Sequence, residues 1–331
     1  MLKKILLISS ANPYPIVTNG CEGLLLDYQQ TVFSGYDVHF VATEPGTWAP
    51  LAWFNGQAKQ GQFSVERLLE LDFAFAFFVG FHYSDFSKQV TARVPSFCLT
   101  DTHPHPDLPE GVFRGILAHR AAVLREDILL CGGSYNSEIF YKHRTGDDFI
   151  VSVGRIHPDK NQLELVTEYR NRIFNRYALP LYLVGGVDDL GYYQKVRPYI
   201  DQVSVRSTID DAHPHALDNW RSPLQVAALL NRARFFVTAS PRESFGIALT
   251  EALACGTTCV LNGEFWGFTP ADLRPHVFGD ITSKRGSILD VLEEALAVGV
   301  RLDGSEWVKK YSVRHAAKPQ MEFIEKRLGE L

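Results

Sequence analysis

The chain has 331 residues, of which 46% are hydrophobic and 12% aromatic, so it has enough apolar material for about two folded domains and too much for a disordered protein. Its 33 Lys and Arg against 38 Asp and Glu give a net charge of -5, which provides no basic excess for binding nucleic acid. The five cysteines are scattered and form no CxxC pair, a pattern that argues against a disulfide framework and favours a reducing, cytoplasmic compartment.

The N-terminal segment Met1–Ser10 has two lysines followed by an apolar run that is shorter than the ~7 to 15 residues of a secretory signal. We therefore expect this segment to form a buried first strand. The longest apolar run, Phe73–Phe81, is also far shorter than the ~20 residues of a membrane-spanning helix. The sequence predicts no transmembrane segment, and at most a peripheral contact with a membrane.

Short apolar runs alternate with longer helical patterns along the whole chain, which is typical of the α/β class with parallel strands buried on both faces. In the first half the predicted strands are Lys4–Ser9, Val38–Ala42, Ala74–Val79, Ser96–Thr100 and Ile128–Cys131. In the second half they are Phe149–Val153, Leu181–Val184, Gln202–Arg206, Phe235–Ala239 and Thr257–Leu261. The clearest helical patterns are Asn161–Tyr177, Pro223–Ala233, Gly246–Cys255 and Ser287–Ala297. The alternation predicts two Rossmann-like halves.

The boundary between the halves is expected in the polar run Lys142–Asp148, which separates two apolar segments. This gives an N-terminal domain of residues 1–145 and a C-terminal domain of residues 146–304. Residues 305–331 alternate apolar and charged positions, so we expect amphipathic helices that pack on a neighbouring surface, with the N-terminal domain as one option.

The most informative motif lies between Phe235 and Asn262, where a buried strand is followed by a loop, a helix and a second buried strand. Glu243 comes just before the predicted helix and Glu251 lies inside it. If all eight residues rise as a helix, the carboxylates are about 12 Å apart along its axis, a span that suits an extended nucleotide ligand. The N–H groups of the first helical turn favour a phosphate between the two carboxylates. Those positions are Ser244, Phe245, Gly246 and Ile247.

The Glu-x7-Glu pattern from Glu243 to Glu251, within PRESFGIALTEALACGT, resembles the signature of retaining GT-B glycosyltransferases of family 4, the glycosyl transferases group 1. The resemblance implies a GT-B fold, with two Rossmann-like domains facing each other across a cleft. It implies a hexosyltransferase that moves a sugar from a nucleotide-sugar donor to a hydroxyl acceptor, such as a glycan or lipid-linked sugar, with retention of configuration, as in polysaccharide biosynthesis. Glu243 would contact the sugar and Glu251 the ribose, and no metal or other cofactor is expected.

Two further segments match the family in the expected order. VSVGRIHPDK resembles its Gly-Arg-x4-Lys element, which implies that Arg155 and Lys160 hold the donor diphosphate. LYLVGG resembles the strand that brings backbone close to the donor, so Gly185 is a second candidate contact, and the base is expected near Val205–Ile209. A UDP-sugar is the first guess for the donor, with GDP and ADP left open.

The first half resembles the family only in outline. Gly20, before a predicted helix, is a candidate contact to the donor, although a helix start that needs a flexible residue explains it equally well. Asp101 and His103 follow a predicted strand, and either could touch the transferred sugar. His82 is a candidate acceptor contact, for which a structural role is the stronger interpretation.

Three other functions fit parts of the sequence. Gly20-x-x-Gly23 followed by Glu44 suggests a Rossmann dehydrogenase, but the first glycine of the fingerprint is missing and the preceding loop is too long. A nucleotide-sugar epimerase on the same fold and a catalytically silent nucleotide-sugar-binding protein remain alternatives. The two His-Pro-His motifs, at His103 and His213, offer imidazoles for a metal, yet nothing in their spacing brings them to one ion.

Overall fold

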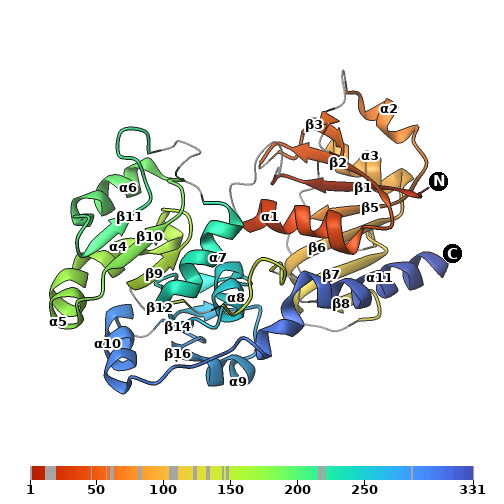
Figure 1. Cartoon of the computed structure of the whole chain (residues 1–331). Helices are drawn as coiled ribbons and strands as arrows, with labels where there is room; N and C mark the ends of the chain where they lie inside the picture. Colours follow the sequence, from red (N-terminus) through yellow and green to blue (C-terminus); the bar gives the residue numbers. More distant parts are fainter. Residues whose placement is uncertain are drawn as a thin grey trace. The chain divides into compact units, whose positions relative to one another are not determined.

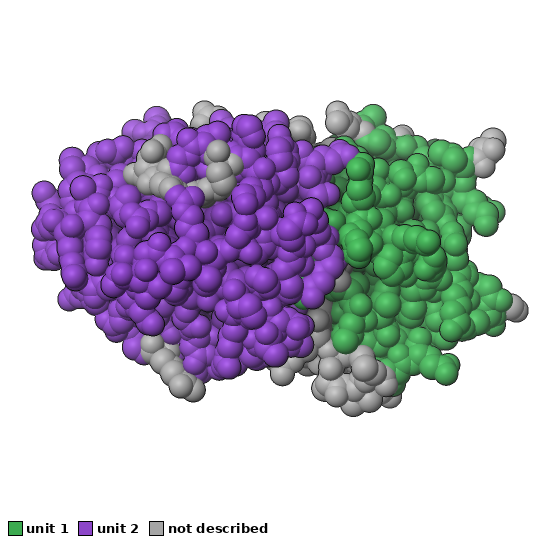
Figure 2. Space-filling view, turned by 60° about the horizontal axis from the view of Figure 1, so that its bottom comes forward, with its two compact units in different colours: residues 1–133, 311–331 green, residues 134–310 purple. Residues whose placement is uncertain are grey.

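The computed structural model describes residues 2–11, 20–45, 47–56, 58–59, 63–80, 84–103, 111–121, 125–131, 135–143, 145–146, 149–214, 219, 221–284 and 286–330. The chain forms two compact units, which Figure 2 colours separately. Unit 1 comprises residues 1–133 and 311–331, and unit 2 comprises residues 134–310. The chain therefore passes from unit 1 into unit 2 and returns to unit 1 in its last segment.

Unit 1 is built, in its described residues, on an eight-stranded sheet of order β4-β3-β2-β1-β5-β6-β7-β8. The strands are β1 (Lys4–Ser9), β2 (Asp37–Thr43), β3 (Pro50–Asn55), β4 (Ala58–Lys59), β5 (Phe73–Val79), β6 (Ser96–His103), β7 (Gly115–Ala121) and β8 (Ile128–Leu130). Strands β2, β1, β5, β6, β7 and β8 pair in parallel in that order. Strand β3 pairs antiparallel with β2 and with β4, so β3 and β4 form an antiparallel edge. Phe75, Phe77 and Phe78 of β5 are fully buried, as expected for a central strand covered on both faces.

The helical segments of unit 1 come from both ends of the chain (Figure 1). They are α1 (Gly20–Asp27), the π-helical turn η1 (Tyr28–Val32), α2 (Val65–Leu69), α3 (Asp85–Arg93) and α11 (Val313–Gly329). Helix α11 packs on η1 and β7. A Cβ at Gly115 of β7 would lie 2.6 Å from the ring of Phe323, so this strand needs a glycine for α11 to approach.

Unit 2 has an all-parallel sheet of order β11-β10-β9-β12-β14-β16 in the described part of the chain. Its strands are β9 (Phe149–Val153), β10 (Leu181–Val184), β11 (Val205–Ser207), β12 (Ala233–Thr238), β14 (Thr258–Asn262) and β16 (Val277–Asp280). Two further strands, β13 (Arg242–Glu243) and β15 (Glu264–Phe265), form a separate parallel pair. The predicted strands 149–153 and 181–184 are confirmed with their bounds.

The helices of unit 2 include the three-residue turn η2 (Pro158–Lys160), α6 (Leu190–Val196), α7 (Pro223–Arg232), α8 (Ile247–Ala254) and α10 (Ile288–Val298). The single helix predicted over Asn161–Tyr177 is divided into α4 (Gln162–Thr167), the π-helical turn η3 (Arg170–Phe174) and α5 (Asn175–Tyr177). Shorter segments are η4 (Arg197–Tyr199), α9 (Pro270–Leu273), η6 (Arg274–His276) and η7 (Trp307–Tyr311).

The polar run expected to separate the domains lies within unit 2 instead. Asn231 of α7 holds it there: its Oδ1 accepts from the backbone N–H of His143 at 2.6 Å, and its Nδ2 donates to the carbonyl of Tyr141 at 3.1 Å. The units divide between residues 133 and 134 and again between 310 and 311, whereas the sequence suggested 145 and 304. A buried asparagine on a distant helix thus assigns this polar segment to the second unit.

Four cysteines in the described residues, Cys98, Cys131, Cys255 and Cys259, are buried free thiols. Burial raises the pKa of the Cys131 thiol to about 12, so it stays protonated and unreactive. Among the helices that the structure describes, none combines the length and the apolar character needed to cross a bilayer.

Candidate functional site

Lys160 and Glu243 meet in unit 2 although 83 residues separate them in the sequence. The Lys160 Nζ donates to Glu243 Oε1 at 2.5 Å, and the two side chains are 24% and 16% exposed. Lys160 closes η2, which follows β9, and Glu243 lies on β13, which follows β12. Because β9 and β12 are adjacent parallel strands, their carboxyl ends bring the two residues to one edge of the sheet.

The loops after β9 and β10 are joined by their backbones at the same edge. The N–H of Gly154 donates to the carbonyl of Val184, and that of Ile156 donates to Gly186, both at 2.9 Å. Gly185 has a φ of +148°, and a Cβ there would lie 2.1 Å from the carbonyl oxygen of Gly154. Gly185 was predicted as a donor contact, and the structure gives it a packing role: it lets the two loops touch.

Arg155 is paired with Asp188, which follows β10. Both side chains are partly exposed, at 41% and 43%. The buried Gln162 of α4 donates to the carbonyl of Arg155 at 2.6 Å and so fixes the backbone of this loop. Neither Asp188 nor Gln162 was among the predicted site residues, although Asp188 could have been found because the ends of neighbouring parallel strands share an edge.

The strand of Glu243 is held by its pairing with β15. The N–H of Trp266 donates to the carbonyl of Glu243 at 3.0 Å. Glu264 accepts from Arg242 Nε at 3.3 Å and from the indole Nε1 of Trp266 at 3.1 Å, and the Arg242 guanidinium lies 4.9 Å from the Trp266 ring centroid. This cluster of Arg242, Glu264 and Trp266 positions the backbone around Glu243, and sequence reasoning missed it because a two-residue strand has no periodicity to detect.

Helix α8 begins at Ile247, four residues after Glu243. Gly246 is the N-cap of α8 in the left-handed region, with φ +74°, and the backbone N–H groups of Leu249 and Thr250 bond back to its carbonyl. The first-turn N–H groups before them have no partner within the helix, as at any helix start. The first-turn donors of α8, the N–H groups of Ile247 and Ala248, therefore follow Glu243 by four and five residues.

One assumption about the predicted span is corrected. The span of about 12 Å between the carboxylates assumed helix from Glu243 onward, but only the five residues from Ile247 to Glu251 are helical, which is four steps and about 6 Å of rise. Phe245 is buried against Phe268, with ring centroids 5.0 Å apart. Its side chain belongs to the core, so this position can offer a ligand only its backbone. Glu251 lies on α8 and is partly buried.

For the candidate site residues of unit 1, the structure describes the backbone position only. Gly20 begins α1, and Asp101 and His103 lie at the carboxyl end of β6. His82 lies outside the described residues, as do His105 and His215 of the two His-Pro-His motifs. His213 is on the surface of unit 2, where its ring pairs with Asp210 at 3.1 Å.

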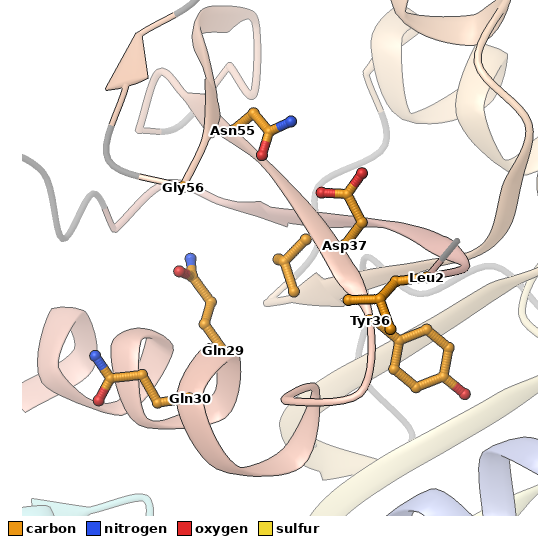
Figure 3. A pocket seen from close by; sticks show the side chains of 8 residues that line it. Leu2, Gln29, Gln30, Tyr36, Asp37, Asn55 and Gly56 are labelled. Carbon is orange, nitrogen blue, oxygen red and sulfur yellow. The ribbon is translucent and has the colours of Figure 1, made fainter.

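A shallow cavity of about 510 Å³ in unit 1 is distinct from these candidates (Figure 3). It lies where β1 and β2 begin, at the amino ends of the parallel strands. Its lining residues are Leu2, Gln29, Gln30, Tyr36, Asp37, Val38, Asn55 and Gly56. No predicted site residue lines it, so the cavity does not mark the candidate site.

Comparison with known proteins agrees with the sequence signature. Residues 137–265 match the family model described as "Glycosyl transferases group 1". The matched segment lies inside unit 2 and contains Arg155, Lys160, Glu243 and Glu251. A search of curated protein sequences finds no relative.

Solved structures with the same architecture match this chain over almost its whole length. Sucrose-phosphate synthase from Thermosynechococcus elongatus has a TM-score of 0.67 at 15% identity, with 99% of each chain covered. A glycosyltransferase from Rickettsia africae has a TM-score of 0.68 at 10% identity, with both chains fully covered. HepE from Anabaena, solved in complex with UDP and glucose, has a TM-score of 0.67 at 12% identity, again with both chains fully covered.

These matches confirm two expectations. The fold is GT-B, an α/β architecture with a mainly parallel sheet in unit 1 and a parallel sheet in unit 2, and the resemblance to group 1 glycosyl transferases is confirmed over residues 137–265. Glycosyl transfer is the activity that the family match supports, and it does not favour the epimerase or silent-protein alternatives.

Proposed function

We propose that this glycosyltransferase is a retaining hexosyltransferase of family 4, which moves a sugar from a nucleotide-sugar donor to a hydroxyl acceptor such as a glycan or lipid-linked sugar. The observation that carries the proposal is the meeting of Lys160 with Glu243 beside the N-terminus of α8. A cation, a carboxylate and the N-terminus of a helix at one sheet edge suit a ligand that combines a diphosphate with a sugar.

Each residue then has a defined role. Arg155, Lys160 and the N–H groups of Ser244–Ile247 hold the diphosphate and stabilise the negative charge that grows as it leaves, which is commonly the largest contribution to such catalysis. Glu243 contacts hydroxyls of the transferred sugar and Glu251 the ribose.

The remaining roles fall to unit 1 and to the donor itself. Asp101 or His103 faces the sugar, and the backbone at Gly20 approaches the donor. The departing diphosphate accepts the acceptor's proton, so the leaving group and the acceptor lie on the same face of the sugar. The reaction needs no metal.

A UDP-sugar is the first choice of donor. HepE, whose fold this chain shares, was solved with UDP and glucose, which supports trying uridine nucleotides before others. GDP and ADP are the alternatives, because the base is expected near Val205–Ile209, where sequence alone does not specify the contacts.

Two measurements test the proposal. UDP, GDP and ADP are titrated against the full chain by calorimetry, and UDP-sugars are then supplied with simple hydroxyl acceptors while the anomeric configuration of the product is followed by NMR. We expect binding of one nucleoside diphosphate and a product that keeps the donor's configuration. An inverted product would contradict retention, interconversion of the donor without an acceptor would indicate an epimerase, and binding without turnover would indicate a silent protein.

Metal independence needs its own experiment. We expect transfer to survive extensive treatment with a chelator, since the diphosphate charge is met by Arg155, Lys160 and backbone donors. Loss of activity that a divalent cation alone restores would overturn this part of the proposal.

A further inference from the structure

Both cations expected to hold the diphosphate already have a carboxylate partner in this structure. Lys160 is paired with Glu243, and Arg155 is paired with Asp188. The formal charges of these four side chains sum to zero. A diphosphate that enters here therefore meets a balanced group of charges and must compete with the carboxylates for its cations.

Asp188 differs from Glu243 in how it is held. Its N–H donates to the carbonyl of Ile156 at 3.3 Å, and its neighbour Val187 forms a bridge with Ile156, so Asp188 is tied to the loop that carries Arg155. On its other side, Asp189 caps α6 by accepting from the N–H of Tyr192 at 2.7 Å. With both flanks fixed, Asp188 stays near Arg155 even when its carboxylate loses that partner.

We propose that Asp188 is a counter-charge that competes with the diphosphate for Arg155 and thereby limits how tightly the nucleoside diphosphate product is retained. The inference rests on the proposed function. When the bond between the sugar and the diphosphate breaks, its electron pair stays on the diphosphate, and after the acquired proton is lost to solvent the product carries about one more negative charge than the donor. Repulsion by a fixed carboxylate is therefore stronger for the product than for the donor, and Asp188 promotes product release.

The size of the effect follows from exposure. The Arg155 and Asp188 side chains are 41% and 43% exposed, so water and salt screen their interaction. Pairs of this kind contribute little, and we expect removal of the Asp188 charge to tighten product binding by about two- to fivefold. The gain should be largest at low ionic strength.

The test compares Asp188→Asn with a matched control. Asp303→Asn removes a carboxylate of similar exposure from its pair with Lys142. Lys142 lies beside Gly256, at the opposite end of α8 from the proposed diphosphate site. UDP, with GDP and ADP in parallel, and the uncharged nucleoside uridine are titrated against the full-length wild type and both variants at low and high salt. We expect tighter UDP binding in Asp188→Asn only, a smaller gain at high salt, unchanged uridine affinity and stronger product inhibition.

A second pair of variants shows whether the effect acts through Arg155. In an Arg155→Ala background, adding Asp188→Asn should give a smaller gain, because only the direct repulsion is removed and the contested cation is absent. An equal gain in both backgrounds would overturn direct competition.

The two proposals fail in different ways. Unchanged or weaker UDP binding by Asp188→Asn, with wild-type binding intact, overturns this inference and leaves the proposed function standing. If the wild type binds no nucleoside diphosphate, the proposed function is wrong and the inference falls with it.

Discussion

The two carboxylates of the signature, Glu243 and Glu251, have different proposed roles, and only Glu243 is described as the partner of Lys160. Mutation of each residue can therefore separate the two roles. Under the proposed function, Glu243→Gln removes a charged contact to the reacting sugar, which should lower kcat by about 10- to 100-fold with little change in donor affinity. Glu251→Gln removes a contact to the non-reacting ribose, so donor binding should weaken by about 1.5 to 3 kcal/mol while kcat is nearly retained. Steady-state kinetics and donor titration measure both quantities.

Lys160→Ala is the reference for these variants. It should reduce both donor affinity and kcat, since the ammonium group meets the diphosphate before and during its departure. If Glu243→Gln and Glu251→Gln both left kcat and donor affinity unchanged, the site would not lie where we place it.

His39 of β2 provides a pH-dependent contribution to stability in unit 1. The indole N–H of Trp53 donates to its Nδ1 at 3.1 Å, so the neutral ring must carry its proton on Nε2, which faces Asp37 at 3.4 Å. Burial lowers the pKa of His39 below its ordinary value, and nearby Asp37 opposes this shift. The folded state therefore favours the neutral ring.

The direction of the pH effect follows from this shift. Because the folded pKa is the lower one, the stabilisation is complete above the unfolded pKa of about 6.5 and is lost as the pH falls through the folded pKa. We expect the free energy of unfolding of unit 1 to fall between pH 7.5 and 5.5, with a slope of at most about 1.4 kcal/mol per pH unit from this residue.

Hydrogen exchange on β2 and β3 at the two pH values measures this loss. It should shrink in His39→Gln and persist in His213→Gln, whose ring is on the surface of unit 2. Equal losses in both variants would assign the pH dependence to other groups.

The contact between the loops after β9 and β10 makes Gly185 critical for the local fold. Gly185→Ala places a methyl group 2.1 Å from a carbonyl oxygen and forces an unfavourable φ, so unit 2 should lose at least about 2 kcal/mol of stability. Gly299→Ala is the control, because Gly299 also has a positive φ but has open space around it, and about 1 kcal/mol is expected there. Urea denaturation compares them, and equal losses would mean that the loop contact costs little.

How far the elements could be predicted depends on whether they are long and apolar. Strands such as 181–184 are continuous apolar runs, so their place in a buried parallel sheet follows from the sequence. The pairing of β13 with β15 could not be predicted, because it depends on backbone hydrogen bonds between two-residue segments. The Glu-x7-Glu spacing identified the helix that carries Glu251, but the left-handed cap at Gly246 means that only the part of this spacing from Ile247 onward is helical.

At the scale of the whole molecule, most candidate donor contacts lie in unit 2, and Gly20, Asp101 and His103 in unit 1 are the exceptions. A fragment of residues 134–310 should therefore fold and bind the nucleoside diphosphate within about tenfold of the intact chain, a difference of about 1.4 kcal/mol. Calorimetry on the fragment and on the full chain measures this directly. A folded fragment with more than about a hundredfold weaker binding would assign major donor contacts to unit 1.

The division into units depends on tertiary contacts that a sequence pattern does not contain. The run beginning at Lys142 has the composition of a linker, yet hydrogen bonds from Asn231 make it part of unit 2. In the same way, amphipathicity predicts a helix near the end of the chain but does not say which surface it covers. The glycine at position 115, which leaves room for Phe323, is the local feature that accommodates α11 on unit 1.

The return of residues 311–331 to unit 1 also sets an order of events during synthesis. A ribosome that adds about 5 to 20 residues per second needs roughly 10 to 35 s to proceed from the end of the first segment of unit 1 to α11. Throughout that interval α11 has not been made, so the surfaces of η1 and β7 that it will cover stay uncovered. The residues of unit 2 are made during the same interval, as one continuous stretch. We expect the later-made unit to complete its fold first, and the earlier-made unit to depend on protection from aggregation until its last helix arrives.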